Sequence, residues 1–205
     1  MRYYMFNKPR GCITACSDKR HKTVMDYLPD SEREGLFPIG RLDKDTEGFL
    51  ILTDDGNFCF HVASPEHKIE KTYVFYAKGT LTEEKIKSLE GGVDIRTADN
   101  RLTAPAKAEK LCELKLRDIA CLLDEDTAKL IHTRRGDVPI TKVKVTITEG
   151  RKHQVKRMAK VVGLSVVYLE RIAISGVFLD KDLPRGKYRP LTEEEILKIK
   201  GEVKR

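Results

Sequence analysis

Residues 38–56 read PIGRLDKDTEGFLILTDDG and place an acid, Asp43, shortly before the apolar run FLIL at residues 49–52. A short apolar run bounded by turn residues predicts a buried strand. A carboxylate at the entrance to such a strand is partly desolvated and needs a cation to stay ionised. The stretch therefore allows two interpretations of Asp43, a catalytic acid or a structural ion pair.

Arg41 offers the structural alternative. In an extended backbone, residues two apart share a face, so Arg41 and Asp43 would lie side by side. Structural ion pairs perturb acids as catalytic sites do, so local chemistry leaves both interpretations open. The nearby acids, Asp45 and the pair at 54–55, do not form a metal cluster with Asp43. Residues 54–57, DDGN, are instead typical of a turn.

The chain of 205 residues fits one domain or two small halves that share a core. Its 39 Lys and Arg against 32 Asp and Glu give a net charge of +7. This balance favours a polyanionic partner, nucleic acid first, over a merely basic surface. Basic residues gather in short clusters, at 8–10, 19–22, 134–135, 152–160 and 185–189. The clusters either converge on one phosphate-lined groove or are unrelated solvated surfaces.

Five cysteines, the lack of a secretion signal and the lack of an apolar run near 18 residues predict a soluble cytoplasmic protein. Cys12, Cys16 and His21 have a spacing that zinc could use. No second close Cys or His pair completes a tetrahedral set, so we expect no metal. A metal-binding regulatory module is the alternative interpretation of these three residues.

Period-two alternation predicts strands at residues 71–78 and 142–148. Helical signals predict three helices, at residues 81–90, 151–163 and 192–200. The first has a threonine cap and a glycine pair at its end, the second has one apolar stripe opposite a basic surface, and the third opens with a capping box. Strands and short helices interleave without a regular βαβ repeat, which predicts the α+β class.

Five segments resemble the RsuA-type pseudouridine synthases. GRLDKDTEGFLILTDDG at 40–56 resembles the catalytic signature of that family. The other segments occur in family order and are YMFNKPRG at 4–11, EKTYVF at 70–75, EGRKHQVKRM at 149–158 and GKYRPLTEEEI at 186–196. Together they span nearly the whole chain, which makes the ordered set far more specific than GRLD alone.

The resemblance implies the pseudouridine synthase fold, a mixed split central sheet with flanking helices and a basic catalytic cleft. It implies a single catalytic domain over residues 1–205, built from two half-sheet subdomains whose boundary the sequence does not locate. The separate N-terminal S4-like RNA-binding module of many members is expected to be missing, because the Asn-Lys-Pro motif begins at Asn7. Residues 111–141 match no family motif and are interpreted as an insertion that assists RNA docking.

The resemblance also implies an isomerase reaction, conversion of uridine to pseudouridine in RNA without metal or cofactor. Asp43 would be the nucleophile, Tyr73 would stack on the target base and accept the C5 proton, and Lys156 would keep Asp43 ionised. The expected RNA contacts are Lys8, Arg10, Arg41, Lys71, Arg151, His153 and Arg157.

The expected partner is ribosomal RNA or an assembling ribosomal subunit, bound by a monomer without a membrane. Small-subunit RNA is favoured because QVKRM and YRPLTEEEI are most similar to that branch of the family. The alternatives are the same reaction on large-subunit RNA and a non-catalytic RNA-binding or ribosome-assembly factor on the same scaffold. Asp43 and Tyr73 are both present with their flanking residues, which favours the enzyme.

Overall fold

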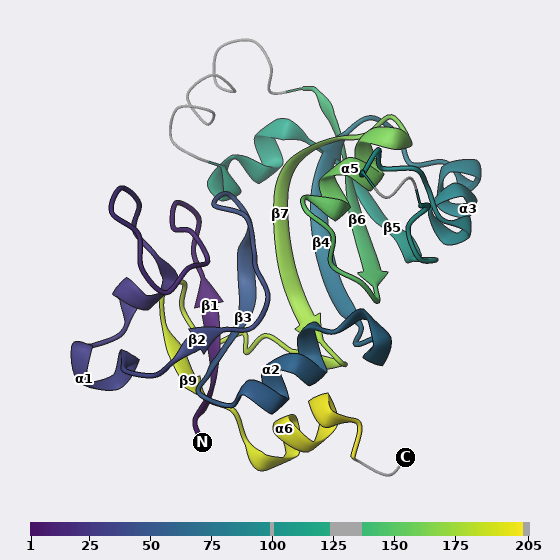
Figure 1. The fold of residues 1–205 in the computed structure, drawn as a ribbon. Helices are drawn as coiled ribbons and strands as arrows, with labels where there is room; N and C mark the ends of the chain where they lie inside the picture. The colour runs from purple at the N-terminus through teal and green to yellow at the C-terminus, as the bar shows by residue number, and fades with distance from the viewer. Residues whose placement is uncertain (99–100, 124–136, 203–205) are drawn as a thin grey trace. The chain divides into compact units, whose positions relative to one another are not determined.

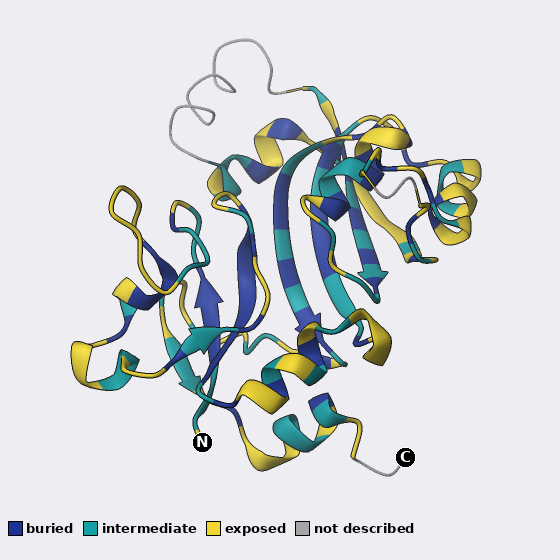
Figure 2. Ribbon diagram, in the orientation of Figure 1, coloured by how far each residue is buried: buried dark blue, intermediate teal, exposed yellow. Residues whose placement is uncertain are grey.

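Strand β3 (Glu47–Thr53) forms from the apolar run that follows Asp43 and is buried along its whole length, as Figure 2 shows. The computed structural model describes residues 1–98, 101–123 and 137–202 of the chain. β3 pairs antiparallel with β1 (Tyr3–Lys8), so that Met5 lies opposite Ile51. It pairs parallel with β7 (Ser165–Ile174) on its other side. The buried strand predicted from residues 49–52 is confirmed.

The strands form a mixed sheet with the order β5-β6-β4-β7-β3-β1-β9 (Figure 1). β2 (Phe37–Pro38) adds to β3, and β8 (Val177–Phe178) adds to β7. The remaining strands are β4 (Lys71–Lys78), β5 (Lys107–Lys115), β6 (Pro139–Ile147) and β9 (Tyr188–Pro190). Helices alternate irregularly with these strands, so the predicted α+β class is confirmed.

The chain divides into two compact units. Unit 1 consists of residues 1–72, 148–150 and 170–205, and unit 2 of residues 73–147 and 151–169. Two of the boundaries fall inside β4 and β7, so each of these strands contributes residues to both units, and the other two lie in the short segment between β6 and α5. A strand that runs through a boundary leaves no linker-like segment there, so composition alone could not locate these two boundaries.

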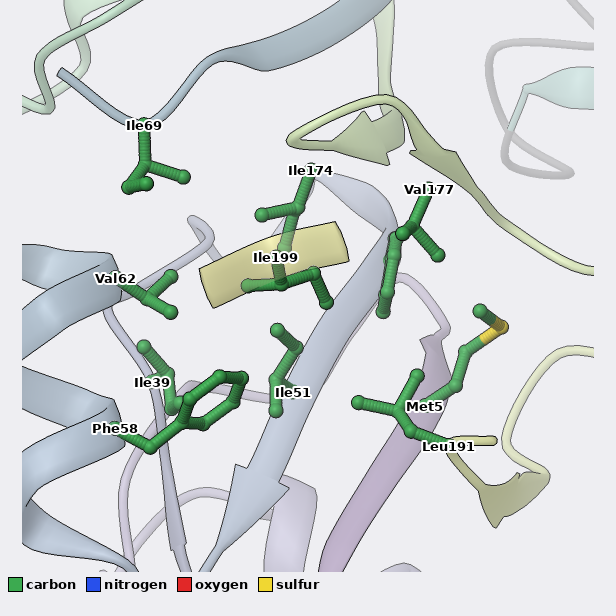
Figure 3. Close-up of a cluster of buried hydrophobic side chains, with 11 residues drawn as sticks. Met5, Ile39, Ile51, Phe58, Val62, Ile69, Ile174, Val177, Leu191 and Ile199 are labelled. Atoms are coloured by element: carbon green, nitrogen blue, oxygen red, sulfur yellow. The ribbon is translucent and has the colours of Figure 1, made fainter. Parts of the chain in front are cut away.

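In unit 1, helices α2 (Gly56–Ala63) and α6 (Glu193–Lys200) supply apolar side chains to a core built on β1 and β3. Figure 3 shows Phe58 of α2 and Ile199 of α6 beside Ile51. Each large side chain buried in this way contributes about 1.5–3 kcal/mol. The shorter helices of unit 1 are η1 (Val24–Tyr27), α1 (Asp30–Arg33) and η2 (Pro65–His67).

Helix α2 begins where the sequence predicted a turn, and that prediction is wrong. The Asp55 carboxylate accepts hydrogen bonds from the backbone N–H groups of Asn57 and Phe58, both at 3.0 Å. Asp55 therefore caps a helix. Aspartate is favoured in turns and at helix N-caps for the same reason, since its short side chain reaches nearby N–H groups.

Unit 2 contains three elements that match their predicted segments: β4, β6 and helix α3 (Glu83–Gly91), whose Thr82 cap accepts from the Lys85 N–H. Helix α5 (Gln154–Val161) begins three residues later than predicted, because His153 adopts a left-handed conformation with φ of 54°. Its predicted apolar stripe is buried. The final helix, α6 of unit 1, also has its predicted capping box.

The ends of the predicted insertion at 111–141 belong to the sheet. β5 and β6 pair antiparallel across it, with Leu114 opposite Ile140, and helix η3 (Leu116–Leu122) follows β5. Figure 2 shows that β5 is largely exposed; it is rich in lysine and glutamate, as suits a strand at a sheet edge. The basic cluster at 132–135 lies outside the described residues.

Gly48 allows β3 to approach β7 closely. It has a φ of +100°, and a Cβ added there would lie 2.3 Å from the backbone oxygen of Arg171. No side chain fits at that distance, and the backbone conformation itself favours glycine. The glycine of the TEG stretch therefore allows the parallel pairing that follows Asp43.

Candidate active site

Asp43 is half-buried and begins the turn that directly precedes β3. The Thr46 N–H donates to the Asp43 carbonyl at 3.0 Å and closes the turn. Arg41 is exposed on the same segment. The structural alternative, an ion pair of Arg41 with Asp43 in an extended stretch, stays a prediction.

Lys8 holds the turn from inside the protein. Its side chain is fully buried, and its ammonium donates to the carbonyls of Pro9, Asp43 and Thr46 at 3.1, 3.0 and 2.8 Å. An ammonium has three N–H donors, so three acceptors fit its charged form. Burial lowers the pKa of Lys8, and the three carbonyls offset part of that cost. The predicted RNA contact of Lys8 is wrong, because no part of it reaches the surface.

The segment after Pro9 holds the other side of the turn. The Thr14 hydroxyl donates to the Leu42 carbonyl at 2.7 Å and accepts from the Leu42 N–H at 3.1 Å. The Gly11 N–H donates to the Lys44 carbonyl at 2.8 Å. The residues on both sides of Asp43 are thus fixed through their backbones. All these bonds involve backbone atoms of the turn. None of them uses the carboxylate of Asp43.

Glu47, the first residue of β3, is a buried acid between two arginines. It is 5% exposed, and its Oε2 lies 2.6 Å from Nε of Arg185. Its Oε1 lies 4.0 Å from Nε of Arg10. A buried carboxylate is tolerated when cations neutralise it, so Glu47 ties Arg10 and Arg185 to the start of β3. Arg10, predicted to contact RNA, therefore also takes part in a structural ion pair.

Two further cations lie close together in unit 1. Arg171 on β7 is 3% exposed and donates from Nε to the Phe49 carbonyl at 2.7 Å. Lys71 at the start of β4 donates to the Ile69 carbonyl at 3.0 Å. Burial, and after it repulsion by Arg171, lowers the pKa of Lys71 to about 8. The ammonium of Lys71 faces the protein, so its predicted contact with RNA has no support here.

In unit 2, Tyr73 lies on β4 and is 8% exposed, so most of its ring packs inside the protein. Lys156 lies half-buried on α5. Next to it, Gln154 is buried and accepts from the Arg151 N–H at 2.8 Å, which stabilises the first turn of the helix. His153, directly before α5, is exposed.

Arg151 and Arg157 hold the loop that precedes β5. The Arg151 guanidinium donates to the carbonyls of Arg101 and Leu102 at 2.8 and 2.9 Å. Arg157 donates to the Ile95 carbonyl at 3.5 Å. These contacts give both arginines a structural role that the sequence did not predict, alongside the RNA contacts expected for them.

The described residues include no group of three or more His, Cys, Asp and Glu side chains arranged to hold a metal ion. Of the two cysteines in the candidate zinc motif, Cys12 is buried and Cys16 is exposed. Among the helices that the structure describes, none is long and apolar enough to cross a bilayer.

Sequence reasoning missed Thr14, Glu47 and Gln154. A threonine in a loop carries no signal of the carbonyl that it will bind. Glu47 left a weak signal, since an acid at the start of an apolar strand must find cations when it is buried. Gln154 stands in the resembling HQV segment, but its bond to the Arg151 N–H depends on the left-handed residue between them.

Comparison with known proteins places this geometry in a family context. A family model described as RNA pseudouridylate synthase matches residues 2–160. The chain is 43% identical over 195 residues to the uncharacterized RNA pseudouridine synthase YtzG of Bacillus subtilis, covering 95% of this chain and 71% of the relative. It is 37% identical over 198 residues to ribosomal small subunit pseudouridine synthase A of Escherichia coli K12, covering 97% and 74% respectively.

A solved structure shares the fold as well. The chain superimposes on a crystal structure of pseudouridylate synthase with a TM-score of 0.79 at 35% identity, covering 97% of this chain and 73% of that one. The fold predicted from the five resembling segments is therefore confirmed.

Replacing Lys8 with methionine tests the buried ammonium. Methionine fills a similar volume but leaves the carbonyls of Asp43 and Thr46 unpaired, so we expect the free energy of unfolding in urea to fall by about 3–5 kcal/mol. Lys44→Met, at an exposed position of the same turn, is the matched control and should change it by less than about 0.5 kcal/mol. Equal effects of the two changes would contradict the role of Lys8.

Lys71 should make stability depend on pH. Its pKa is about 8 in the folded protein and 10.5 ordinarily, so between these values the unfolded chain holds the extra proton and stability rises with pH. Below about pH 8 the charge is present in both states and its burial destabilises the fold. We expect Lys71→Met to be more stable than wild type at about pH 7, with a difference that shrinks toward about pH 10. Urea unfolding curves that keep a constant difference would contradict this.

Proposed function

Because the chain belongs to the RNA pseudouridylate synthase family, we propose that it isomerises uridine to pseudouridine in small-subunit ribosomal RNA. The relative from Escherichia coli, named for the ribosomal small subunit, supports this RNA class. The observation that carries the proposal is the turn at Asp43, whose backbone is bound by Lys8, Thr14 and Gly11. Such a turn presents one carboxylate at a defined place, as a nucleophile requires.

In the proposed reaction, Asp43 acts at the ribose of the target uridine. It either attacks C1′ or serves a glycal route, and in both cases the bond from N1 to C1′ breaks. The free uracil rotates, and a bond from C5 to C1′ forms as the bond from Asp43 to C1′ breaks or, on the glycal route, as C2′ regains its proton. The C5 proton then leaves to a base, and N1 gains a proton. Asp43 and Tyr73 can serve as nucleophile and base without metal or cofactor.

The partners of Asp43 follow from the family resemblance and from burial. Tyr73, which is 8% exposed, contacts the uracil. Lys156 supplies the positive charge that keeps Asp43 ionised. Flipping the uridine out of its stack costs a few kcal/mol, which contacts to the base and to flanking phosphates offset.

Among the predicted RNA contacts, Arg41 and His153 are exposed and therefore retained in the proposal. Arg10, Arg151 and Arg157 have structural bonds and play at most a secondary part. We propose that the two units work as one catalytic domain, and that a monomer acts on ribosomal RNA or on an assembling subunit.

The first test is tritium release from RNA labelled at C5 of uridine. Wild type should release tritium from unmodified small-subunit RNA. Asp43→Asn should release less than about 1% of that amount while its affinity for RNA changes less than about twofold, because one charge is removed without a change of shape. Asp45→Asn, an exposed acid two residues away, should keep wild-type turnover.

The outcomes separate the alternatives. Turnover of Asp43→Asn above about a tenth of wild type would contradict the nucleophile. Release from large-subunit RNA alone would change the RNA class. If neither free RNA reacts, the assay is repeated with partly assembled subunits, and no release there would favour a non-catalytic RNA-binding factor on this scaffold.

Lys156→Met tests the counter-charge. Loss of the ammonium removes the positive charge that we propose for Asp43, so turnover at neutral pH should fall about a hundredfold. Lys152→Met removes an equal charge from an exposed position before the same helix and should have little effect. Normal turnover of Lys156→Met would assign the role to another cation.

A further inference from the structure

Unit 2 contains an open hollow of about 680 Å³ between the end of β4 and helix α5. It is lined by residues 78–79 at the end of β4, by two lysines of α5 and by the segment that leads into β7. The lining residues are Lys78, Gly79, Lys156, Lys160, Gly163, Leu164, Ser165 and Val166. Nothing in the proposed reaction uses this hollow as a whole.

The charge of the hollow has one sign. Three of its lining residues are lysines, and no lining residue is acidic. Lys156 and Lys160 are one helical turn apart, so their side chains lie on the same face of α5. A fourth ammonium, that of Lys85, lies at the edge, 3.7 Å from the place that a Cβ on Gly163 would occupy. Such a concentration of positive charge attracts an anion.

The backbone of the hollow is built around two glycines. Gly79 has a φ of +105°, and a Cβ added there would lie 2.9 Å from the Gly163 carbonyl, so the two segments meet without side chains between them. The Thr141 hydroxyl donates to the Gly79 carbonyl at 2.7 Å and fixes it. The backbone that lines the hollow is therefore fixed, and no side chain projects from either glycine.

Its chemistry suits the backbone of a nucleic acid strand. Lysines bind phosphate as point charges and carry no base specificity. Ser165 adds a hydroxyl that can donate to a phosphate oxygen, and Leu164 and Val166 add apolar surface for a sugar. A small free anion would contact the lysines but not the apolar side chains of Leu164 and Val166.

The hollow lies along the strand that carries Tyr73. Lys78 is five residues further on β4, which is about 16 Å at the usual rise of about 3.3 Å per residue. Because this spacing is odd, the side chains of Tyr73 and Lys78 point to opposite faces of the strand, and the path from Tyr73 to the hollow passes the end of β4 at Gly79. A stacked nucleic acid strand needs at least about five nucleotides for this distance. We propose that the hollow binds phosphodiesters of the substrate RNA strand a few nucleotides from the target uridine. This inference rests on the proposed function and adds a binding site to it.

The test uses Lys78→Gln combined with Lys160→Gln, and it leaves Lys156 in place. RNA affinity, measured by fluorescence anisotropy on a small-subunit RNA fragment, should fall about tenfold near 0.1 M salt. The slope of log affinity against log salt should become shallower by about 1–2, one phosphate contact for each lysine.

The matched control is Lys87→Gln combined with Lys181→Gln, which removes the same charge from exposed positions that do not line the hollow. It should change affinity less than about twofold. Equal losses of RNA affinity in the two double variants would mean that only the net charge matters, and would overturn the site. Unchanged affinity in the Lys78 and Lys160 variant would overturn it as well, while tritium release by wild type would still support the isomerase.

A titration with inorganic phosphate separates the two sources of the anion. The RNA proposal expects wild type to bind free phosphate only weakly, in the millimolar range. Tight binding of free phosphate that the Lys78 and Lys160 variant loses, with RNA affinity unchanged, would make the hollow a small-anion site and overturn the proposal. If RNA binding is lost in the same variant and wild type releases no tritium from free RNA or from partly assembled subunits, the result would support the hollow and refute the isomerase.

Discussion

The ammonium of Lys8 is the interaction on which the turn at Asp43 depends. Three carbonyls, from Pro9, Asp43 and Thr46, converge on one point that no solvent reaches. Each would be costly to leave unpaired there, and a single compact group with three donors satisfies all of them. Arginine, with its planar fork of donors, would not match acceptors arranged around a point. The fold thus keeps one buried charge that fixes the backbone of the turn at Asp43.

Charged side chains bind the start of β3 and the residue before it. Lys8 binds the Thr46 carbonyl, Arg10 and Arg185 flank the Glu47 carboxylate, and Arg171 binds the Phe49 carbonyl. Gly48, between them, gives the space for β7 to approach. The TEG stretch is therefore explained residue by residue by the neighbours of the strand. Several basic residues near Asp43 stabilise protein structure, so a basic cluster in the sequence is not by itself a binding surface.

The sequence predicted those features that depend on residues close together in the chain. The caps of α3 and α6 and the alternation of β4 and β6 depend on neighbours in the chain, and these predictions are confirmed. The burial of Lys8 depends on carbonyls from residues 35 and 38 positions away, which no local pattern encodes. Asp55 shows the same limit at short range, because a turn and a helix cap begin with the same hydrogen bonds. The roles of Asp43, Tyr73 and Lys156 came from family resemblance, and they stay predictions.

The pairing of β1 with β9 has a consequence for the time at which this protein matures. Figure 1 shows the first strand of the chain beside the last, and Tyr4 lies opposite Pro190. Because a ribosome delivers the chain from its N-terminus, the pairing of β1 with β9 and the ion pair of Glu47 with Arg185 form only after these later residues have been synthesised. The backbone bonds of the Asp43 turn need only residues 8–46, so the turn precedes this edge of the sheet during synthesis.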